Sequence, residues 1–139
     1  MSIGILLVTH GKIGDTFLES ARQLLGEPPV KIASLGVLNS MRPEQICDYI
    51  RELTDSVNGG DGVLILSDLI GATPSNNVHR VCHGCNLGYP LRNVSGLNLP
   101  MLLRIWNHLM LNAEMDLATA AKTALEGGHK GIIDPDNDQ

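Results

Sequence analysis

The sequence has few aromatic residues, few cysteines and no long hydrophobic run. Its single tryptophan, Trp106, stands among apolar residues at helical spacing, so we expect it in a hydrophobic core or a dimer face rather than stacked on a cofactor. Three cysteines cannot all pair with one another, and so low a count excludes a small secreted domain built on disulfides. No segment approaches the roughly 18 apolar residues of a membrane-spanning helix, and no basic leader follows Met1. We therefore expect reduced thiols and a cytoplasmic location.

Basic residues are also scarce. Ten Lys and Arg face 15 Asp and Glu, which gives a formal net charge of −5. A protein that binds the phosphate backbone of nucleic acid needs a basic stripe, and the sequence shows none. The 139 residues, 43% of them hydrophobic, suffice for one core. We expect one domain over residues 1–139, with a polar tail from about residue 135.

The hydrophobic pattern alternates between short apolar runs and segments of helical spacing. The run 3–8 is evenly apolar, as in a strand that is covered on both faces. This pattern predicts an α/β fold with a single open, mostly parallel sheet and helices on both faces. An edge strand at residues 130–134 is also expected, for which an antiparallel direction is one option. The strands are expected at 3–8, 30–35, 63–66 and 91–95. Helices are expected at 15–25, 40–57 and 115–125. One further helix is expected to begin at residue 73, and another to end at about residue 111.

Two residues whose side chains could take part in a reaction follow strands that are expected to be buried. His10 comes just after the first apolar run, and Asp68 comes just after the third. In open parallel sheets the carboxyl ends of the strands share one edge and ligands bind there, so both side chains are expected to face one cleft. A carboxylate that accepts the Nδ1–H of His10 would fix the tautomer and leave Nε2 as a nucleophile. We therefore treat His10 and Asp68 as the candidate catalytic pair.

A candidate anion site follows Asp68. The segment 71–76 opens a helix, for which Thr73 is the expected N-cap and Pro74 the first helical residue. Main-chain N–H groups and hydroxyls at a helix N-terminus suit a phosphate. Gly71, Ala72, Thr73 and Ser75 are the candidate phosphate-binding residues. A nucleophilic histidine beside such a site is typical of phosphoryl transfer through a phosphohistidine.

A metal site is the main alternative elsewhere in the chain. His79, Cys82 and His83 have positions i, i+3 and i+4 of the helix that begins near Thr73, and Cys85 follows. These ligand types suit zinc. A core-facing thiol with surface histidines explains the same pattern. We expect no metal and leave open whether these four residues bind one.

Three ordered motifs give the chain a resemblance to a known family. They are Thr9-His10-Gly11, the segment 68–76 that begins Asp68-Leu69-Ile70-Gly71, and the segment 96–102 that begins Gly96-Leu97-Asn98. The chain resembles, from about residue 3 to 125, the mannose-type (mannose, fructose, sorbose) IIA components of the bacterial phosphoenolpyruvate-dependent sugar phosphotransferase system.

The resemblance implies a phosphotransferase in which His10 accepts a phosphoryl group from the phosphocarrier protein HPr and passes it to a IIB protein. It also implies that Asp68 orients His10 and that Thr73 and nearby amides hold the phosphoryl oxygens. A homodimer is implied in which residues 130–134 cross to the partner. No metal or organic cofactor is implied, and the membrane is reached only through a transporter complex.

The sequence departs from the family pattern at two positions. Ile70 stands where an aromatic residue is usual, and Ala72 stands where a second glycine is usual. If the loop requires a positive φ at position 72, alanine would be strained. These departures motivate an alternative, a stand-alone regulatory phosphoprotein in which the phosphorylation state of His10 controls partner binding. A flavodoxin-like binder of small molecules is a third option.

Overall fold

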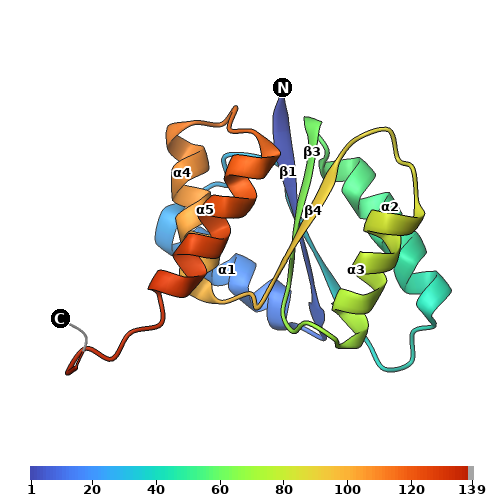
Figure 1. Ribbon diagram of the computed structural model, residues 1–139, viewed down its shortest axis with the longest axis horizontal. Helices are drawn as coiled ribbons and strands as arrows, with labels where there is room; N and C mark the ends of the chain where they lie inside the picture. Colours follow the sequence, from blue (N-terminus) through green and yellow to red (C-terminus); the bar gives the residue numbers. More distant parts are fainter. Residues whose placement is uncertain (138–139) are drawn as a thin grey trace.

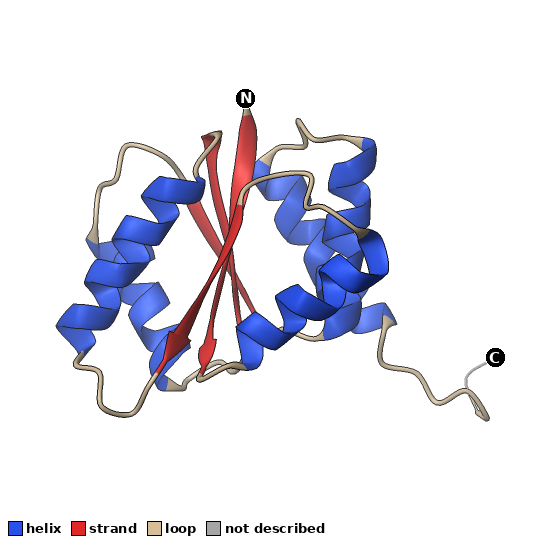
Figure 2. Ribbon diagram, turned by 180° about the vertical axis from the view of Figure 1, so that it is seen from behind, coloured by secondary structure: helices blue, strands red, loops and turns tan. Residues whose placement is uncertain are grey.

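The computed structural model describes residues 1–137 as a three-layer α/β sandwich in which one sheet lies between two helical layers (Figures 1 and 2). Asp138 and Gln139, the end of the expected polar tail, lie outside the described residues. The elements in chain order are β1 (Ser2–His10), α1 (Ile13–Leu25), β2 (Ile32–Val37), α2 (Pro43–Val57), β3 (Gly60–Ser67), α3 (Thr73–Gly84), β4 (Leu91–Ser95), α4 (Leu99–Leu111) and α5 (Leu117–Lys130).

The four strands form one open, parallel sheet in the order β2-β1-β3-β4. Each strand is followed by at least one helix, which returns the chain to the starting edge, so all four carboxyl ends lie on one edge. In Figure 1 this is the lower edge, where α1 and α3 begin. The strands β1 and β3 occupy the middle, and their residues are almost all buried. The fold class expected from the sequence is confirmed.

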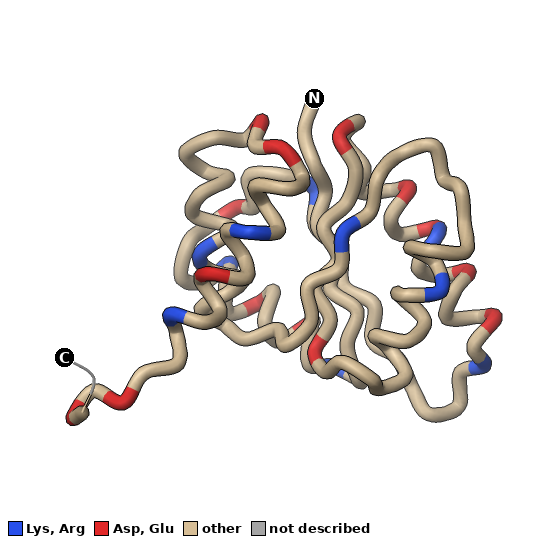
Figure 3. The backbone as a smooth tube through the Cα atoms, in the orientation of Figure 1, with Lys and Arg blue, Asp and Glu red and all other residues tan. Residues whose placement is uncertain are grey.

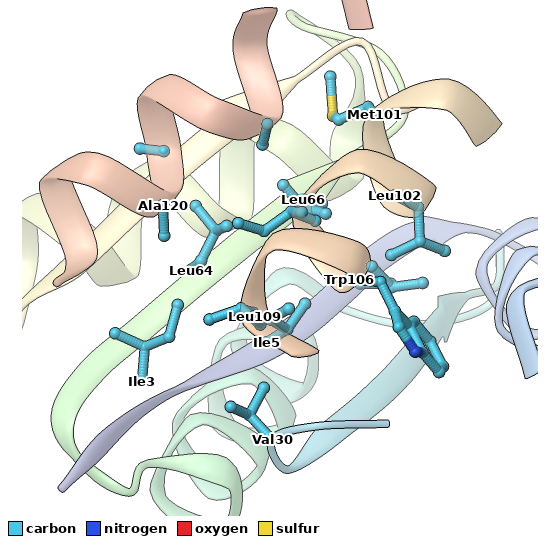
Figure 4. Packing of buried hydrophobic residues seen from close by; sticks show 14 of the residues in the cluster. Ile3, Ile5, Val30, Leu64, Leu66, Met101, Leu102, Trp106, Leu109 and Ala120 are labelled. Atoms are coloured by element: carbon cyan, nitrogen blue, oxygen red, sulfur yellow. The ribbon is translucent and has the colours of Figure 1, made fainter. Parts of the chain in front are cut away.

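The sheet has a hydrophobic core on each face because its central strands are apolar on both sides. On one face Ile5 and Leu64 pack against α1, α4 and α5, with Trp106 and Leu102 of α4 buried among them (Figure 4). On the other face residues such as Ile65 pack against α2 and α3. These two cores hold the carboxyl edge of β1 and β3 in place, and that edge carries the candidate catalytic residues.

The C-terminal segment differs from the expectation. Helix α5 does not end at residue 125 but continues to Lys130. Gly127 is one reason, since a Cβ there would lie 2.5 Å from Cβ of Arg104, so only glycine permits this close packing on α4. Among the described residues 1–137, residues 131–134 pair with no strand, because a strand needs a partner edge and no described strand edge reaches them. Their exchange into a dimer stays a prediction.

The described residues contain no candidate membrane span and no concentration of basic residues (Figure 3). None of the helices within residues 1–137 is long and apolar enough to cross a membrane. Lys and Arg are scattered among Asp and Glu along the described backbone and form no basic stripe (Figure 3).

Candidate functional site

The residues singled out by the sequence meet at the carboxyl edge of the sheet. His10 is the last residue of β1, and Asp68 directly follows β3. The two strands are neighbours, with Val8 paired to Ser67, so the register brings the next residues of both strands together. His10 and Asp68 thus become adjacent although 58 positions separate them in the sequence.

The contact between them is a double one. Oδ2 of Asp68 lies 2.7 Å from Nδ1 of His10 and also accepts the main-chain N–H of His10 at 3.0 Å. An ionised carboxylate can only accept hydrogen bonds, so Nδ1 carries a proton, and in the neutral ring the lone pair is then on Nε2. The His10 side chain is 43% exposed, whereas that of Asp68 is 11% exposed. The ring is fixed at its inner nitrogen and open to the surface.

The pKa of Asp68 reflects two opposing effects. Burial of the carboxyl, the largest single effect, raises its pKa. The main-chain and ring hydrogen bonds from His10 and the charge of the ring together lower the pKa by more, so that the net pKa lies below the ordinary value. Asp68 is therefore ionised throughout the neutral range. A carboxylate that remains ionised can stabilise a positive charge that develops on the imidazole.

The start of α3 is open to an anion. Gly71 takes the left-handed conformation, with φ 83°, and turns the chain into the helix. No side chain caps the first turn, which also contains no acidic residue. Unpaired main-chain N–H groups at a helix N-terminus favour negative charge. The first turn of α3 therefore has the properties of a phosphate site.

Two details of this turn correct the sequence interpretation. The N-cap is Ala72 rather than Thr73, because the Asn76 N–H already bonds the Ala72 carbonyl and the helix begins one residue earlier. Pro74 is then the second helical residue, where its missing N–H is again harmless. Ala72 has φ −86°, so the alanine is not strained and Gly71 alone provides the positive φ.

The candidate phosphate-binding residues differ in access. Thr73 is exposed and Ala72 is half-buried, whereas Ser75 is only 4% exposed. The Thr73 hydroxyl and the main-chain groups of the turn are thus the accessible ligands. Ser75 is buried in the first turn of α3, and its role at a phosphate stays a prediction.

A groove of about 700 Å³ begins at Asp68 and runs between β4 and α5. Its walls include Val94, Ala121 and Leu125, and Arg92 and Lys122 add two cations. Oδ1 of Asp68 and Oγ of Ser95, which also lie along it, are buried and have no hydrogen-bond partner within the described chain. Nothing in the amino-acid pattern predicts this groove, because only the fold brings β4 and α5 together.

The histidines and cysteines of α3 do not gather into a metal site. His79 and His83 have ring centroids 4.3 Å apart, and Cys85 accepts a hydrogen bond from Nε of Arg51 at 3.3 Å. Burial raises the pKa of the Cys82 thiol to about 11. In the part of the chain that the structure describes, no three His, Cys, Asp or Glu side chains are placed to hold a metal ion.

Exposed apolar side chains lie at the same edge of the sheet as His10. Ile13 follows β1, Leu38 follows β2, and Leu69 and Ile70 follow β3. Ile70 is 77% exposed. Exposed apolar residues gathered at one edge beside a polar group are typical of a protein contact surface.

Comparison with solved structures gives the same fold. A phosphotransferase system component EIIA from Streptococcus agalactiae superposes with a TM-score of 0.83 at 22% identity, covering 98% of this chain and 99% of that one. A mannose/sorbose specific IIA subunit from Enterococcus faecalis gives 0.79 at 21% identity, covering 100% and 98%. A sigma-54 interaction domain protein from Enterococcus faecalis gives 0.73 at 14% identity, covering 94% and 93%.

The fold and the site thus define an open parallel α/β protein in which an aspartate orients a histidine and a helix without a side-chain cap begins at the same sheet edge. The family model of the PTS system fructose IIA component, EIIA-man, matches residues 4–123. The chain belongs to this family of phosphotransferase components, whose members are phosphoryl carriers of the bacterial sugar phosphotransferase system.

Proposed function

We propose that this protein carries a phosphoryl group on Nε2 of His10, which it accepts from phospho-HPr and passes to a IIB protein in the cytoplasm. The observation that carries the proposal is the 2.7 Å contact between Nδ1 of His10 and Asp68, which assigns the proton of the neutral ring to Nδ1 and the lone pair to Nε2, on a side chain that is 43% exposed. Family membership supplies the reaction class. The domain 1–139 carries the whole proposed site.

In the proposed step the Nε2 lone pair attacks the phosphorus in line with the donor's N–P bond. That bond breaks and its electron pair returns to the donor imidazole, while a new bond forms between Nε2 and phosphorus. The His10 ring keeps its Nδ1 proton and becomes cationic, and the Asp68 carboxylate stabilises this charge. The Thr73 hydroxyl and the first-turn N–H groups of α3 bind the phosphoryl oxygens. Transfer to the IIB protein is the same displacement in reverse.

The exposed apolar residues at the His10 edge of the sheet support docking of a protein donor. Donor and acceptor must each bring a reactive group to Nε2, so both are proposed to bind over Ile13, Leu38, Leu69 and Ile70. Ile70 replaces the usual aromatic residue at the most exposed point of this surface. Its contact is therefore expected to tune which partner binds.

A homodimer is proposed as the working form. The groove beside β4 is unfilled by the chain itself, and the apolar Ile132 and Ile133 of the tail are 77% and 66% exposed. The tail leaves the end of α5 on the side away from β4 (Figures 1 and 2). We propose that residues 130–134 pair with β4 of a second copy, where the acidic Asp134 and Asp136 approach Arg92 and Lys122.

The test is phosphorylation in a defined system of phosphoenolpyruvate, enzyme I and HPr. Wild-type protein is expected to acquire acid-labile phosphate, and His10→Ala is expected to acquire none. His108→Ala is a matched control, since His108 lies on α4 outside the site. Equal labelling of His10→Ala and wild type would overturn the proposal.

A regulatory role is the second candidate, motivated by the departure at the exposed Ile70. In this role His10 is phosphorylated in the same way, but the phosphate changes partner binding and is not passed on. Transfer from the phosphorylated protein to a panel of IIB proteins separates the two candidates. Loss of the label to a IIB protein supports the carrier, and its retention supports the regulatory role.

A further inference from the structure

The turn between β1 and α1 lies directly against β2 at Gly36. Gly36 pairs with Thr9, and the N–H of Gly11 bonds the carbonyl of Val37 at 3.0 Å. A Cβ at position 36 would lie 2.1 Å from the carbonyl oxygen of Gly11 and 3.1 Å from its carbon. Non-bonded carbon and oxygen atoms do not approach so closely, so any side chain at position 36 would displace the Gly11 peptide by about 1 Å.

The constraint at Gly36 is one of space and not of backbone conformation. Gly36 is not among the glycines with positive φ, so an alanine there would find an ordinary strand backbone. The rest of the turn is fixed in a similar way. The buried Thr9 hydroxyl accepts the Gly14 N–H at 2.8 Å, and a Cβ at Gly14 would lie 2.5 Å from Oγ of Ser34. The β1–α1 turn and the first turn of helix α1 therefore both pack against small residues, Gly36 and Ser34, on one face of β2.

This packing acts on His10 because Gly11 is the next residue. His10 is held by Asp68 on the β3 side, through its main-chain N–H and its ring, and the turn is held by Gly36 and Val37 on the β2 side. A displaced Gly11 peptide would rotate the adjoining His10 backbone. Because both hydrogen bonds from His10 end on the same Asp68 oxygen, such a rotation would misalign the ring.

We infer that Gly36 is a positioning residue for phosphoryl transfer: its missing side chain lets the β1–α1 turn lie against β2 and so directs the His10 imidazole at Asp68. The inference rests on the proposed function of His10. It assigns a role to a β2 residue that belongs to none of the three motifs.

The test compares Gly36→Ala with Gly84→Ala. Gly84 ends α3, does not have a positive φ and has no atom within 4 Å of an added Cβ, so its alanine variant is a matched control. Phosphorylation from phospho-HPr at saturating donor is expected to fall about 100-fold in Gly36→Ala, since an error of about 1 Å in a reacting group has that effect. The KM of Gly36→Ala for the donor is expected to remain within about twofold of the wild-type value. The phosphorylation rate of the control Gly84→Ala is expected to remain within about twofold of the wild-type rate.

Two further readouts separate positioning from a general loss of structure. The ¹⁵N resonance of Nδ1 in Gly36→Ala is expected to move toward that of an imidazole without a carboxylate partner. In a double-mutant cycle, adding Asp68→Asn to Gly36→Ala is expected to cost far less than in the wild-type background, because both changes disturb one contact. Independent, multiplicative effects would overturn the inference.

Circular dichroism measures the folded fraction of each variant in sucrose, which favours the compact state. The phosphorylation rates are then normalised to that folded fraction. The inference requires that only the turn gives way, so a Gly36→Ala chain that stays unfolded in sucrose contradicts it. A Gly36→Ala chain that is labelled as fast as wild type contradicts it as well. Absence of label on wild-type His10 would instead be a failure of the proposed function.

Discussion

One carboxylate oxygen of Asp68 accepts two hydrogen bonds from His10, at 3.0 Å from the main-chain nitrogen and at 2.7 Å from Nδ1. The first bond fixes where the residue is, and the second fixes how its ring is turned and which nitrogen bears the proton. The buried carboxylate thus controls the position of the ring and which of its nitrogens bears the proton in the neutral form, while the His10 side chain stays 43% exposed.

Asp68→Asn is expected to slow phosphorylation of His10 by about 10- to 100-fold, the usual effect of removing a group that orients a reactive histidine. The neutral amide keeps the size of the side chain but cannot stabilise a cationic ring. Rapid-quench measurement of phosphate uptake, with circular dichroism to verify the fold, checks this result. Unchanged uptake would remove Asp68 from the mechanism.

The lowered pKa of Asp68 predicts how stability depends on pH. Because the folded-state pKa is below the ordinary value of 3.8, the ionised carboxylate stabilises the folded state fully above that value, and this contribution is lost as the pH falls through the folded-state pKa. Urea unfolding of wild type and Asp68→Asn between pH 5 and about pH 2 measures the difference. We expect the advantage of wild type to hold near pH 5 and to shrink below about pH 4. An advantage that grows with acidity would refute this.

Thr73→Ala is expected to reduce the rate of phosphoryl transfer by about tenfold while the main-chain N–H of residue 73 still binds the phosphate. The Ser56 hydroxyl bonds the Leu53 carbonyl on α2, so Ser56→Ala serves as a hydroxyl-removal control away from the site. The same uptake assay measures both variants. If Thr73→Ala matches Ser56→Ala, the hydroxyl does not bind the phosphoryl group.

The proposed dimer predicts that the pair Ile132→Asp and Ile133→Asp yields a monomer. Charged side chains cannot occupy the apolar part of the groove beside β4 without a desolvation cost. Leu111→Asp, at an apolar residue of α4 that is 82% exposed, is the matched control and is expected to leave the mass unchanged. Light scattering after gel filtration gives the mass. A dimeric double variant would exclude the tail as the contact.

Much of the fold could be predicted from the sequence because its central strands are apolar on both faces. The expected fourth strand, 91–95, agrees with β4, and the helix expected to reach about residue 111 ends there. Helix ends were harder to predict. The helix expected from residue 40 begins at Pro43, and α5 runs beyond residue 125 because glycines let it pack closely on α4. Such packing is a property of two helices together.

The contact of His10 with Asp68 could be expected because both residues follow strands whose carboxyl ends share an edge. The roles of the two residues and of Gly71, Ala72, Thr73 and Ser75 stay predictions. Gly36 could not be found in the same way. Its importance depends on the register that sets it opposite Thr9, and nothing in the local sequence indicates that register.

The most direct test of the account is to determine which atom carries the phosphate. The protein is phosphorylated with phosphoenolpyruvate, enzyme I and HPr after ¹⁵N labelling of its histidines, and ¹⁵N and ³¹P resonances are recorded at neutral pH. We predict a single phosphohistidine, with phosphorus on Nε2 of His10 and a proton retained on Nδ1. Phosphate on Nδ1 of His10, or on any other residue, would contradict the account.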